Sequence, residues 1–371
     1  MESRTLVLSF TFSFESQVDW VAALKRFTWH LLVVGLVFLL IGELWFRLPW
    51  TTKLVVWQFD EELVSRLAAP QSRGIGLGNF SAVSPPMGIN RDGFRNSEID
   101  WTLPTILAIG SSELLGPGVE DNEVWTAIVS ERLSVATGER ITVVNAGSGG
   151  HGPYHHAVQL RRFLEKHPRP LLVLVRVSVG DRYFVKPDAA ELDAARNRNL
   201  LSSQIKRYSE FLPFLVNKIQ AQIVAIQDTL AQFRRVKRSA GRHEAPAVAD
   251  AMWQANASFW KEIASRATMF SVPVLFYVDG ADGAASAERL SELLSQEFRG
   301  RGDVSVVLFG ARDIGLSTHD DTLRRRQYRE QFTLGYDPHA NVRLHRLEAE
   351  FLTTLLIDRL PSRGPSPWHV Q

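Results

Sequence analysis

A serine follows the first strongly apolar run downstream of residue 100, and it could be either a catalytic residue or part of an ordinary turn. The stretch LAIGSSELLGPG at 107–118 ends its apolar residues at Gly110 and sets Ser112 beside an acid. A serine hydroxyl becomes a good nucleophile only when a base removes its proton. Gly and Ser are also favoured in turns for steric and hydrogen-bonding reasons alone. Taken by itself, the stretch favours a plain turn.

Three further polar segments could likewise contain either catalytic residues or ordinary turns. They are NAGSGGHGPYHH at 145–156, RVSVGDRYF at 176–184 and GYDPHANVRLHRLEAEFL at 335–352. Each has a plain explanation: glycines serve tight turns, Asp181 caps a helix, and Asp337 before Pro338 starts a turn. These explanations weaken when the segments are taken together, because the loops of a doubly wound sheet converge at one edge.

The elements that would position these segments are short apolar runs alternating with amphipathic stretches. The runs lie at 105–109, 141–145, 171–177, 272–278 and 304–309. Nearly continuous Val, Ile and Leu suits strands buried on both faces. The alternation predicts an α/β fold, a doubly wound parallel sheet with helices on both faces. Residues 185–250 break the rhythm and are predicted to be a helical insertion.

The bulk composition excludes some classes of site. The chain has 371 residues, of which 45 % are hydrophobic and 22 % charged, with a net charge of +2 and no cysteine. Such a chain can bury a sizeable core, and nothing in its charge indicates nucleic-acid binding. The absence of cysteine excludes disulfides, thiolate metal sites and a cysteine nucleophile.

A membrane segment is predicted near the N-terminus. Residues 29–48 form a 20-residue apolar span, about the length that crosses a hydrocarbon core of roughly 30 Å. Tryptophans and a phenylalanine lie at both ends, as interfacial aromatics do. A buried core helix and a cleaved signal peptide are the alternatives, but bulky residues follow the apolar core where a signal peptide has small ones. An uncleaved single-pass anchor is therefore favoured.

This anchor sets the expected organisation of the chain. Residues 1–28 are predicted to be cytoplasmic, and the part after the anchor lies on the non-cytoplasmic side, the periplasmic face of the inner membrane if the source is bacterial. Residues 49–87 are predicted to be a stalk and linker, helical at first and then rich in Gly, Ser and Pro. The main domain spans 88–360, and a disordered tail follows at 361–371.

Over roughly residues 88–357 the motifs resemble the SGNH/GDSL hydrolase family. Gly110-Ser111-Ser112 is similar to the family's Gly-Asp-Ser block, which implies that Ser112 is the nucleophile. Asn145-Ala146-Gly147 matches the second block, which implies that the N–H of Gly147 binds an oxyanion together with that of Ser112.

The last block of the resemblance supplies the base. Asp337-Pro338-His339 is similar to the Asp-x-His of anchored and polysaccharide-acylating members, and Asn341 and His345 fit the usual continuation. The resemblance implies that His339 takes the serine proton and that Asp337 orients the imidazole. Glu113, Asn145, His151, Asp181 and Asn341 are candidate residues of the substrate cleft, and no metal or other cofactor is expected.

Two departures from the family pattern leave a second interpretation open. Ser111 stands where the family has Asp, and Gly180 stands where the third block has an Asn that donates to the oxyanion. Losing one such donor costs about 10²–10³ in rate. The alternative is therefore a non-catalytic module that binds a glycan or a partner. A nucleotide-binding domain is disfavoured, because neither G-x-G-x-x-G nor a P-loop follows the first strand.

The resemblance, together with the anchor, implies a serine esterase or O-acyltransferase. Its expected substrates are acyl esters, acetyl esters above all, of an envelope or exported glycan. The implied partners are this glycan, the membrane through residues 29–48, and a membrane-bound O-acyltransferase. The segment GINRDGFRNSE at 88–98 resembles one that precedes the first strand in anchored members.

Overall fold

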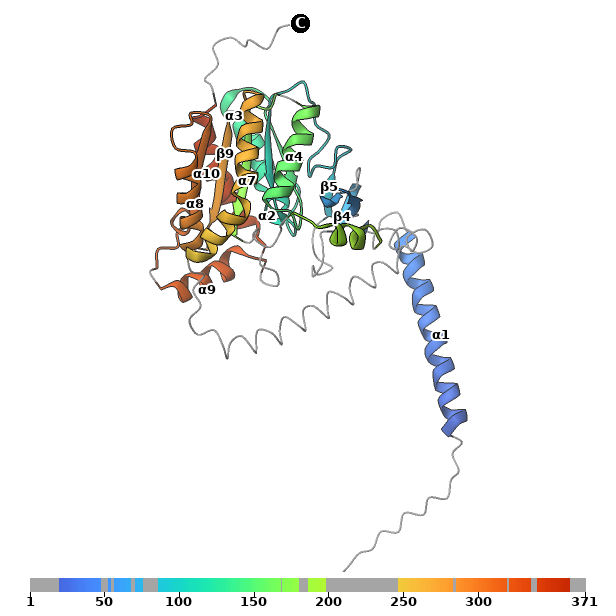
Figure 1. Cartoon of the computed structure of the whole chain (residues 1–371). Coiled ribbons are helices and arrows are strands. Elements are labelled where there is room, and N and C mark those ends of the chain that lie inside the picture. The colour runs from blue at the N-terminus through green and yellow to red at the C-terminus, as the bar shows by residue number, and fades with distance from the viewer. Residues whose placement is uncertain are drawn as a thin grey trace, which may run out of the picture.

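A computed structural model of the chain describes most of the main domain and the N-terminal helix (Figure 1). The described residues are 20–47, 53–54, 57–67, 71–75, 86–167, 169–179, 186–197, 246–282, 285–318, 320–334 and 339–360. Residues 1–19 of the predicted N-terminal segment 1–28, and the predicted C-terminal tail 361–371, lie outside them.

Five parallel strands form the central sheet. They are β6 (Thr105–Gly110), β7 (Thr142–Gly147), β8 (Leu172–Ser178), β9 (Val274–Gly280) and β10 (Val304–Gly310). Their spatial order is β10-β9-β8-β6-β7, and every neighbouring pair is parallel. Each strand begins within two residues of a predicted apolar run. The predicted doubly wound parallel sheet is confirmed.

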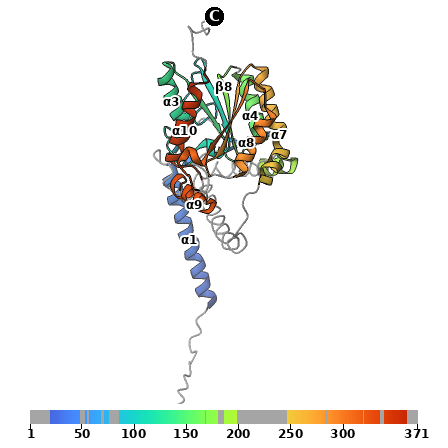
Figure 2. The ribbon, with the colours of Figure 1, turned by 90° about the vertical axis from the view of Figure 1, so that its left-hand side faces the viewer.

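Helices cover both faces of this sheet. Figure 2 shows α3 (Trp125–Thr137) and α10 (Val342–Ile357) on one side and α4 (Pro153–Lys166), α7 (Pro246–Met269) and α8 (Ala285–Glu297) on the other. Each side has its own apolar core, which packs the helices on the buried side chains of the strands. Both faces of the sheet are therefore covered, as parallel sheets require.

Shorter elements complete the main domain. They are α2 (Ser112–Leu115), a 3-10 turn at Ala311–Ile314, and α9 (Asp321–Phe332). Part of the predicted insertion is described: a helix occupies 189–197, and α7 begins at Pro246. The central part of the insertion, 198–245, lies outside the described residues.

The N-terminal helix α1 spans Trp20–Arg47 (Figure 1). Its segment Leu24–Trp45, 22 residues, is long and apolar enough to cross a membrane, and none of its best 18-residue window is buried in the molecule. The full exposure does not fit a buried core helix. A signal sequence satisfies the same test of length and composition.

The stalk differs from its prediction. Strands replace the helix expected at its start: β1 (Lys53–Leu54), β2 (Trp57–Asp60) and β3 (Val64–Leu67). Two further strands, β4 (Gln71–Ile75) and β5 (Pro86–Ile89), lie in the predicted linker and at its end. Strands β2 and β3 pair as an antiparallel hairpin. The hairpin docks on α4, where Arg162 bonds Asp60 at 2.7 Å and Glu62 at 2.7 Å. These contacts with a distant helix override the local helical tendency.

Candidate active site

Ser112 begins the four-residue helix α2, which is separated from the buried strand β6 by Ser111 alone. All six residues of β6 are buried. A Cβ on Gly110 would lie 2.9 Å from the Cβ of Leu114 and 3.1 Å from that of Arg176. The chain therefore turns sharply at a residue without a side chain, and α2 ends at Gly116, whose φ of 70° is left-handed. This turn presents Ser112 at the carboxyl end of the sheet.

His339 lies beside Ser112. Its Nε2 is 2.9 Å from Ser112 Oγ, although the two residues are 227 positions apart in the sequence. In the tautomer protonated on Nδ1, Nε2 accepts the hydroxyl proton of the serine. Both side chains are partly exposed, so a ligand can approach them. This geometry is that of a nucleophile and its base. Asp337 lies outside the described residues.

The C-terminal end of α2 is held by Arg95, a residue of the segment 88–98 for which the sequence predicted no role. Its guanidinium donates to the carbonyl oxygens of Leu115 at 2.8 Å, Gly116 and Val119 at 2.6 Å. The side chain is only 1 % exposed. Arginine is rarely buried without partners. No local sequence pattern predicts that Arg95 would be surrounded by these three carbonyl oxygens.

Asn145 and Gly147 also support α2. Asn145 is fully buried and donates from Nδ2 to Leu114 O at 2.9 Å, while its Oδ1 accepts the N–H of Gly147 at 2.9 Å. A Cβ on Gly147 would lie 2.3 Å from Leu115 N, so α2 packs directly on this glycine. Two expectations are corrected: Asn145 does not face a cleft, and the N–H predicted to bind an oxyanion is already engaged.

The loop after β7 contains other amides. Ser148 O accepts the N–H of His151 at 3.3 Å, which closes a turn over Gly149 and Gly150. Gly150 has a φ of 77°, which suits glycine. Among the described residues, no acceptor is recorded for the N–H groups of Gly149, Gly150 or Ser112.

His151 is not a cleft residue. It is 2 % exposed, and its Nε2 is 2.9 Å from Ser65 O in the β2–β3 hairpin. Burial lowers the pKa of His151 to about 4 and that of His155 to about 3. Both rings are therefore neutral at pH 7, and they stack with centroids 4.8 Å apart. They connect the hairpin to the start of α4, which corrects the expectation for His151.

The remaining candidates for the substrate cleft, Asn341, Glu113 and Asp181, have different outcomes. Asn341 caps α10: its Oδ1 accepts Leu344 N at 3.1 Å, and its Nδ2 donates to Gln331 O at 2.9 Å. This side chain serves the helix N-terminus, which corrects the prediction. Glu113 is 26 % exposed beside Ser112. Asp181 and Gly180 lie outside the described residues.

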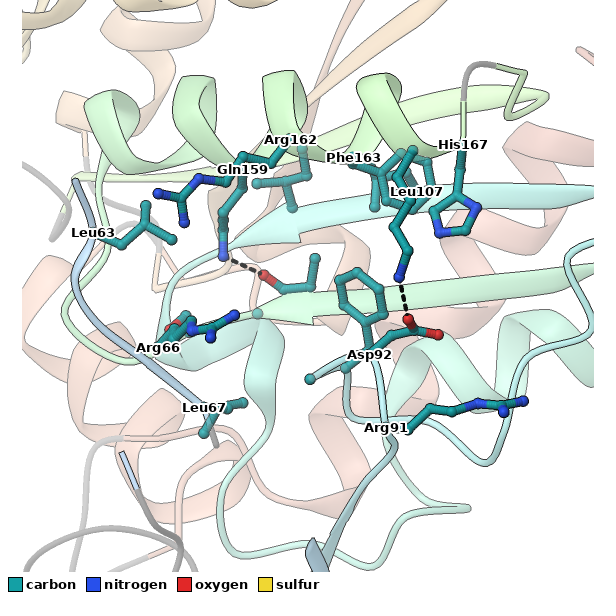
Figure 3. A pocket seen from close by; sticks show the side chains of 17 residues that line it. Leu63, Arg66, Leu67, Arg91, Asp92, Leu107, Gln159, Arg162, Phe163 and His167 are labelled. Atoms are coloured by element: carbon teal, nitrogen blue, oxygen red, sulfur yellow. Dashed lines mark hydrogen bonds and ion pairs between the residues drawn. The ribbon is translucent and has the colours of Figure 1, made fainter. Parts of the chain in front are cut away.

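A cavity of about 390 Å³ lies on the α4 side of the sheet (Figure 3). Leu107 and Phe163 contribute to its apolar wall, and Lys166 at its rim is paired with Asp92 at 2.5 Å. Ser112 is not among its lining residues. The cavity is therefore separate from the Ser112–His339 pair.

Searches against known proteins found similarity in solved structures. No protein-family model matches the chain, and no curated protein matches its sequence. A lipolytic protein of the G-D-S-L family from Veillonella parvula is 12 % identical, with a TM-score of 0.37, over 68 % of this chain and 96 % of its own. AlinE4, an SGNH-hydrolase family esterase, is 14 % identical, with a TM-score of 0.35, over 71 % of this chain and 100 % of its own.

An acetylxylan esterase from Geobacillus stearothermophilus, in a catalytically mutated form, is also similar. It is 12 % identical, with a TM-score of 0.37, and the match covers 71 % of this chain and 97 % of that one. The G-D-S-L and SGNH structures belong to the family that the sequence motifs resemble. Similarity at this level assigns neither residues nor a substrate.

Proposed function

We propose that this chain is a serine ester hydrolase or acyltransferase of the SGNH/GDSL type. The observation that carries the proposal is the 2.9 Å separation of Ser112 Oγ and His339 Nε2 at the carboxyl end of a doubly wound sheet. Ligands bind at this end of such sheets. The turn at Gly110 and the packing of α2 on Gly147 hold the serine in place.

The proposed reaction proceeds through an acyl-enzyme. Ser112 Oγ attacks the ester carbonyl while its proton passes to His339 Nε2. The tetrahedral intermediate collapses, the C–O bond to the leaving alcohol breaks, and the imidazolium gives that alcohol its proton. Water, or the hydroxyl of an acceptor, then attacks the acyl group while His339 takes its proton. The proton returns to Ser112 Oγ as the ester to the serine breaks.

The oxyanion and the third catalytic group form part of the same proposal. The N–H groups of Ser112, Gly149 and Gly150 are proposed as oxyanion donors, in place of Gly147, because no acceptor among the described residues engages them. Asp337, two residues before His339, is proposed to orient the imidazole and to stabilise its cation.

The proposed substrate is an acyl ester of a glycan, acetyl esters above all, with α1 as a membrane anchor. Support comes from the resemblance to anchored glycan-acylating members and from the exposed apolar segment Leu24–Trp45. An exposed apolar helix of this length needs a membrane or a partner to cover it. The main domain is proposed to lie on the non-cytoplasmic side.

Labelling by a fluorophosphonate probe tests this function. The full chain in detergent is compared with Ser112→Ala, His339→Ala and the control Ser295→Ala, which changes an exposed serine of α8. We expect wild type and the control to be labelled and to hydrolyse an aryl acetate. Both catalytic variants should lose about 10⁴-fold or more in turnover. Equal labelling of wild type and Ser112→Ala would overturn the assignment, and a wild type without reaction favours the binding module.

A further inference from the structure

A buried cluster of charged side chains lies beneath the turn that carries Ser112. It comprises Arg176 of β8, Asp279 of β9, Glu348 of α10 and Glu113 of α2. Arg176 is 1 % exposed and Glu348 is 0 % exposed. Isolated buried charges are costly, so a cluster shared by four elements must be held by specific geometry.

Arg176 is the centre of this cluster. Its Nη2 donates to Asp279 Oδ2 at 2.8 Å and to Glu348 Oε1 at 2.7 Å. Its Nη1 lies 3.7 Å from Glu113 Oε2, an ion pair without a hydrogen bond. One planar guanidinium therefore faces three carboxylates from three different elements, an arrangement that the fork geometry of arginine permits.

Two of these carboxylates belong to the helices that carry or follow the residues of the candidate active site. Glu113 follows Ser112 in α2, so its ion pair acts on the helix that presents the nucleophile. Glu348 is on α10, whose capping residue Asn341 comes two residues after His339. The Cβ of Arg176 would also lie 3.1 Å from a Cβ on Gly110, so Arg176 packs closely beneath the turn before Ser112.

The cluster has three carboxyl groups and one guanidinium. Tyr277 and His345 also face Glu348: Tyr277 donates its hydroxyl at 3.1 Å, and His345 Nδ1 lies 3.5 Å away. Burial, with the negative charges of Glu348 and Glu113, raises the pKa of Asp279 to about 7 against the opposing effect of Arg176. The single guanidinium therefore limits how much negative charge the cluster holds at neutral pH.

We propose that Arg176 is a positioning residue for the reaction of Ser112, because it joins the nucleophile helix to the helix that follows the catalytic histidine. This inference rests on the proposed function. Arg176 has no path to a substrate, since it is buried under the turn, so it acts through the placement of Ser112 relative to His339. A misplacement of about 1 Å can cost about 10²-fold in rate.

The variant that tests this is Arg176→Lys, which keeps the charge and loses the fork. An ammonium is a point charge that cannot serve all three carboxylates in the same geometry. We expect kcat for an aryl acetate to fall about 10–100-fold while KM changes less than about twofold. The matched control is Arg162→Lys, in which another arginine that bonds two carboxylates, Asp60 and Glu62, is changed on α4.

Fluorophosphonate labelling of the full chain in detergent separates placement from folding. The labelled fraction at long times counts folded sites, and the rate constant reports the reactivity of Ser112. The proposal predicts an Arg176→Lys chain that reaches the wild-type endpoint at least tenfold more slowly, while Arg162→Lys keeps the wild-type rate. A folded Arg176→Lys chain labelled at the wild-type rate overturns it.

Glu113→Gln provides the second variant if Arg176→Lys does not fold. The side chain is partly exposed, so its substitution spares the core, yet it removes the charge by which α2 contacts Arg176. We expect a threefold or larger fall in the labelling rate, with a pH profile altered between pH 6 and 8. A wild-type rate and profile overturn the role of Arg176. If wild type itself is not labelled, the proposed function fails first, which distinguishes the two failures.

Discussion

The two ends of the helix that carries Ser112 are held by buried arginines with different partners. At the C-terminal end, Arg95 donates to three backbone carbonyls, and its carboxylate partner Asp121 is 51 % exposed. Beneath the N-terminal end, Arg176 faces carboxylates, of which Glu348 is completely buried. One end is held by neutral dipoles and the other by charges.

This difference predicts different responses to pH. Backbone carbonyls do not titrate, so the Arg95 contacts stay the same across the physiological range. Burial raises the pKa of Asp279 to about 7, so the Arg176 cluster changes its charge near neutrality. The C-terminal end of α2 therefore provides a fixed attachment, while the N-terminal end is sensitive to the charge balance of the Arg176 cluster.

Arg176→Met should have the largest effect on stability. It leaves Glu348 and Asp279 buried without their cation, which costs about 3–5 kcal/mol. This cost should be greatest near pH 8 and smaller near pH 5, because the uncompensated carboxylates can take up protons at low pH. Thermal unfolding of the full chain at both pH values measures it. A pH-independent cost would remove the contrast between the two ends.

Arg95→Met should lower the free energy of unfolding somewhat less than Arg176→Met, and by the same amount at pH 5 and pH 8. Each buried carbonyl left without a donor costs about 1–3 kcal/mol, and three uncharged carbonyls at the low end of this range sum to about 3 kcal/mol. We expect a loss of about 3 kcal/mol, unchanged between pH 5 and pH 8. The same thermal scans test this. A cost that varies between pH 5 and pH 8 would contradict an attachment made by uncharged carbonyls.

Asp279→Asn should alter how stability depends on pH. A carboxyl whose pKa is raised from about 4 to about 7 binds a proton more tightly in the folded state. It therefore stabilises the fold below pH 4, and this contribution is lost as pH rises to 7. The asparagine in the variant does not titrate, so the variant does not lose this stability as pH rises. The Tm of the variant relative to wild type should therefore rise from pH 5 to pH 8. A relative Tm that falls over this range would contradict the assignment.

Asp121→Asn should have the smallest effect. Asp121 bonds Arg95 Nε at 3.0 Å, but its side chain is half-exposed and water screens the pair. We expect a loss below about 1 kcal/mol and an unchanged rate of Ser112 labelling. A loss as large as that of Arg95→Met would mean that the ion pair, and not the carbonyl contacts, holds this end of α2.

Much of the fold could be predicted because its signal is local. Runs such as 105–109 and 171–177 read as strands buried on both faces, and the structure confirms a parallel sheet of five strands. The stalk could not be predicted in the same way. The β2–β3 hairpin depends on ion pairs with Arg161 and Arg162, about 100 residues away, and nothing nearby in the sequence indicates them.

For the candidate site, the sequence by itself determined which residue types stand at the ends of the strands. Gly110 and the glycines of 147–150 follow buried runs of the sequence, and Ser112 comes two residues after Gly110. Only the tertiary structure decided their contacts: that His339 lies 2.9 Å from Ser112, that Asn145 donates to Leu114 O, and that Arg95 and Arg176 hold α2. Strand patterns arise from neighbouring residues, whereas each of these contacts requires the chain to be packed before its partner can be known.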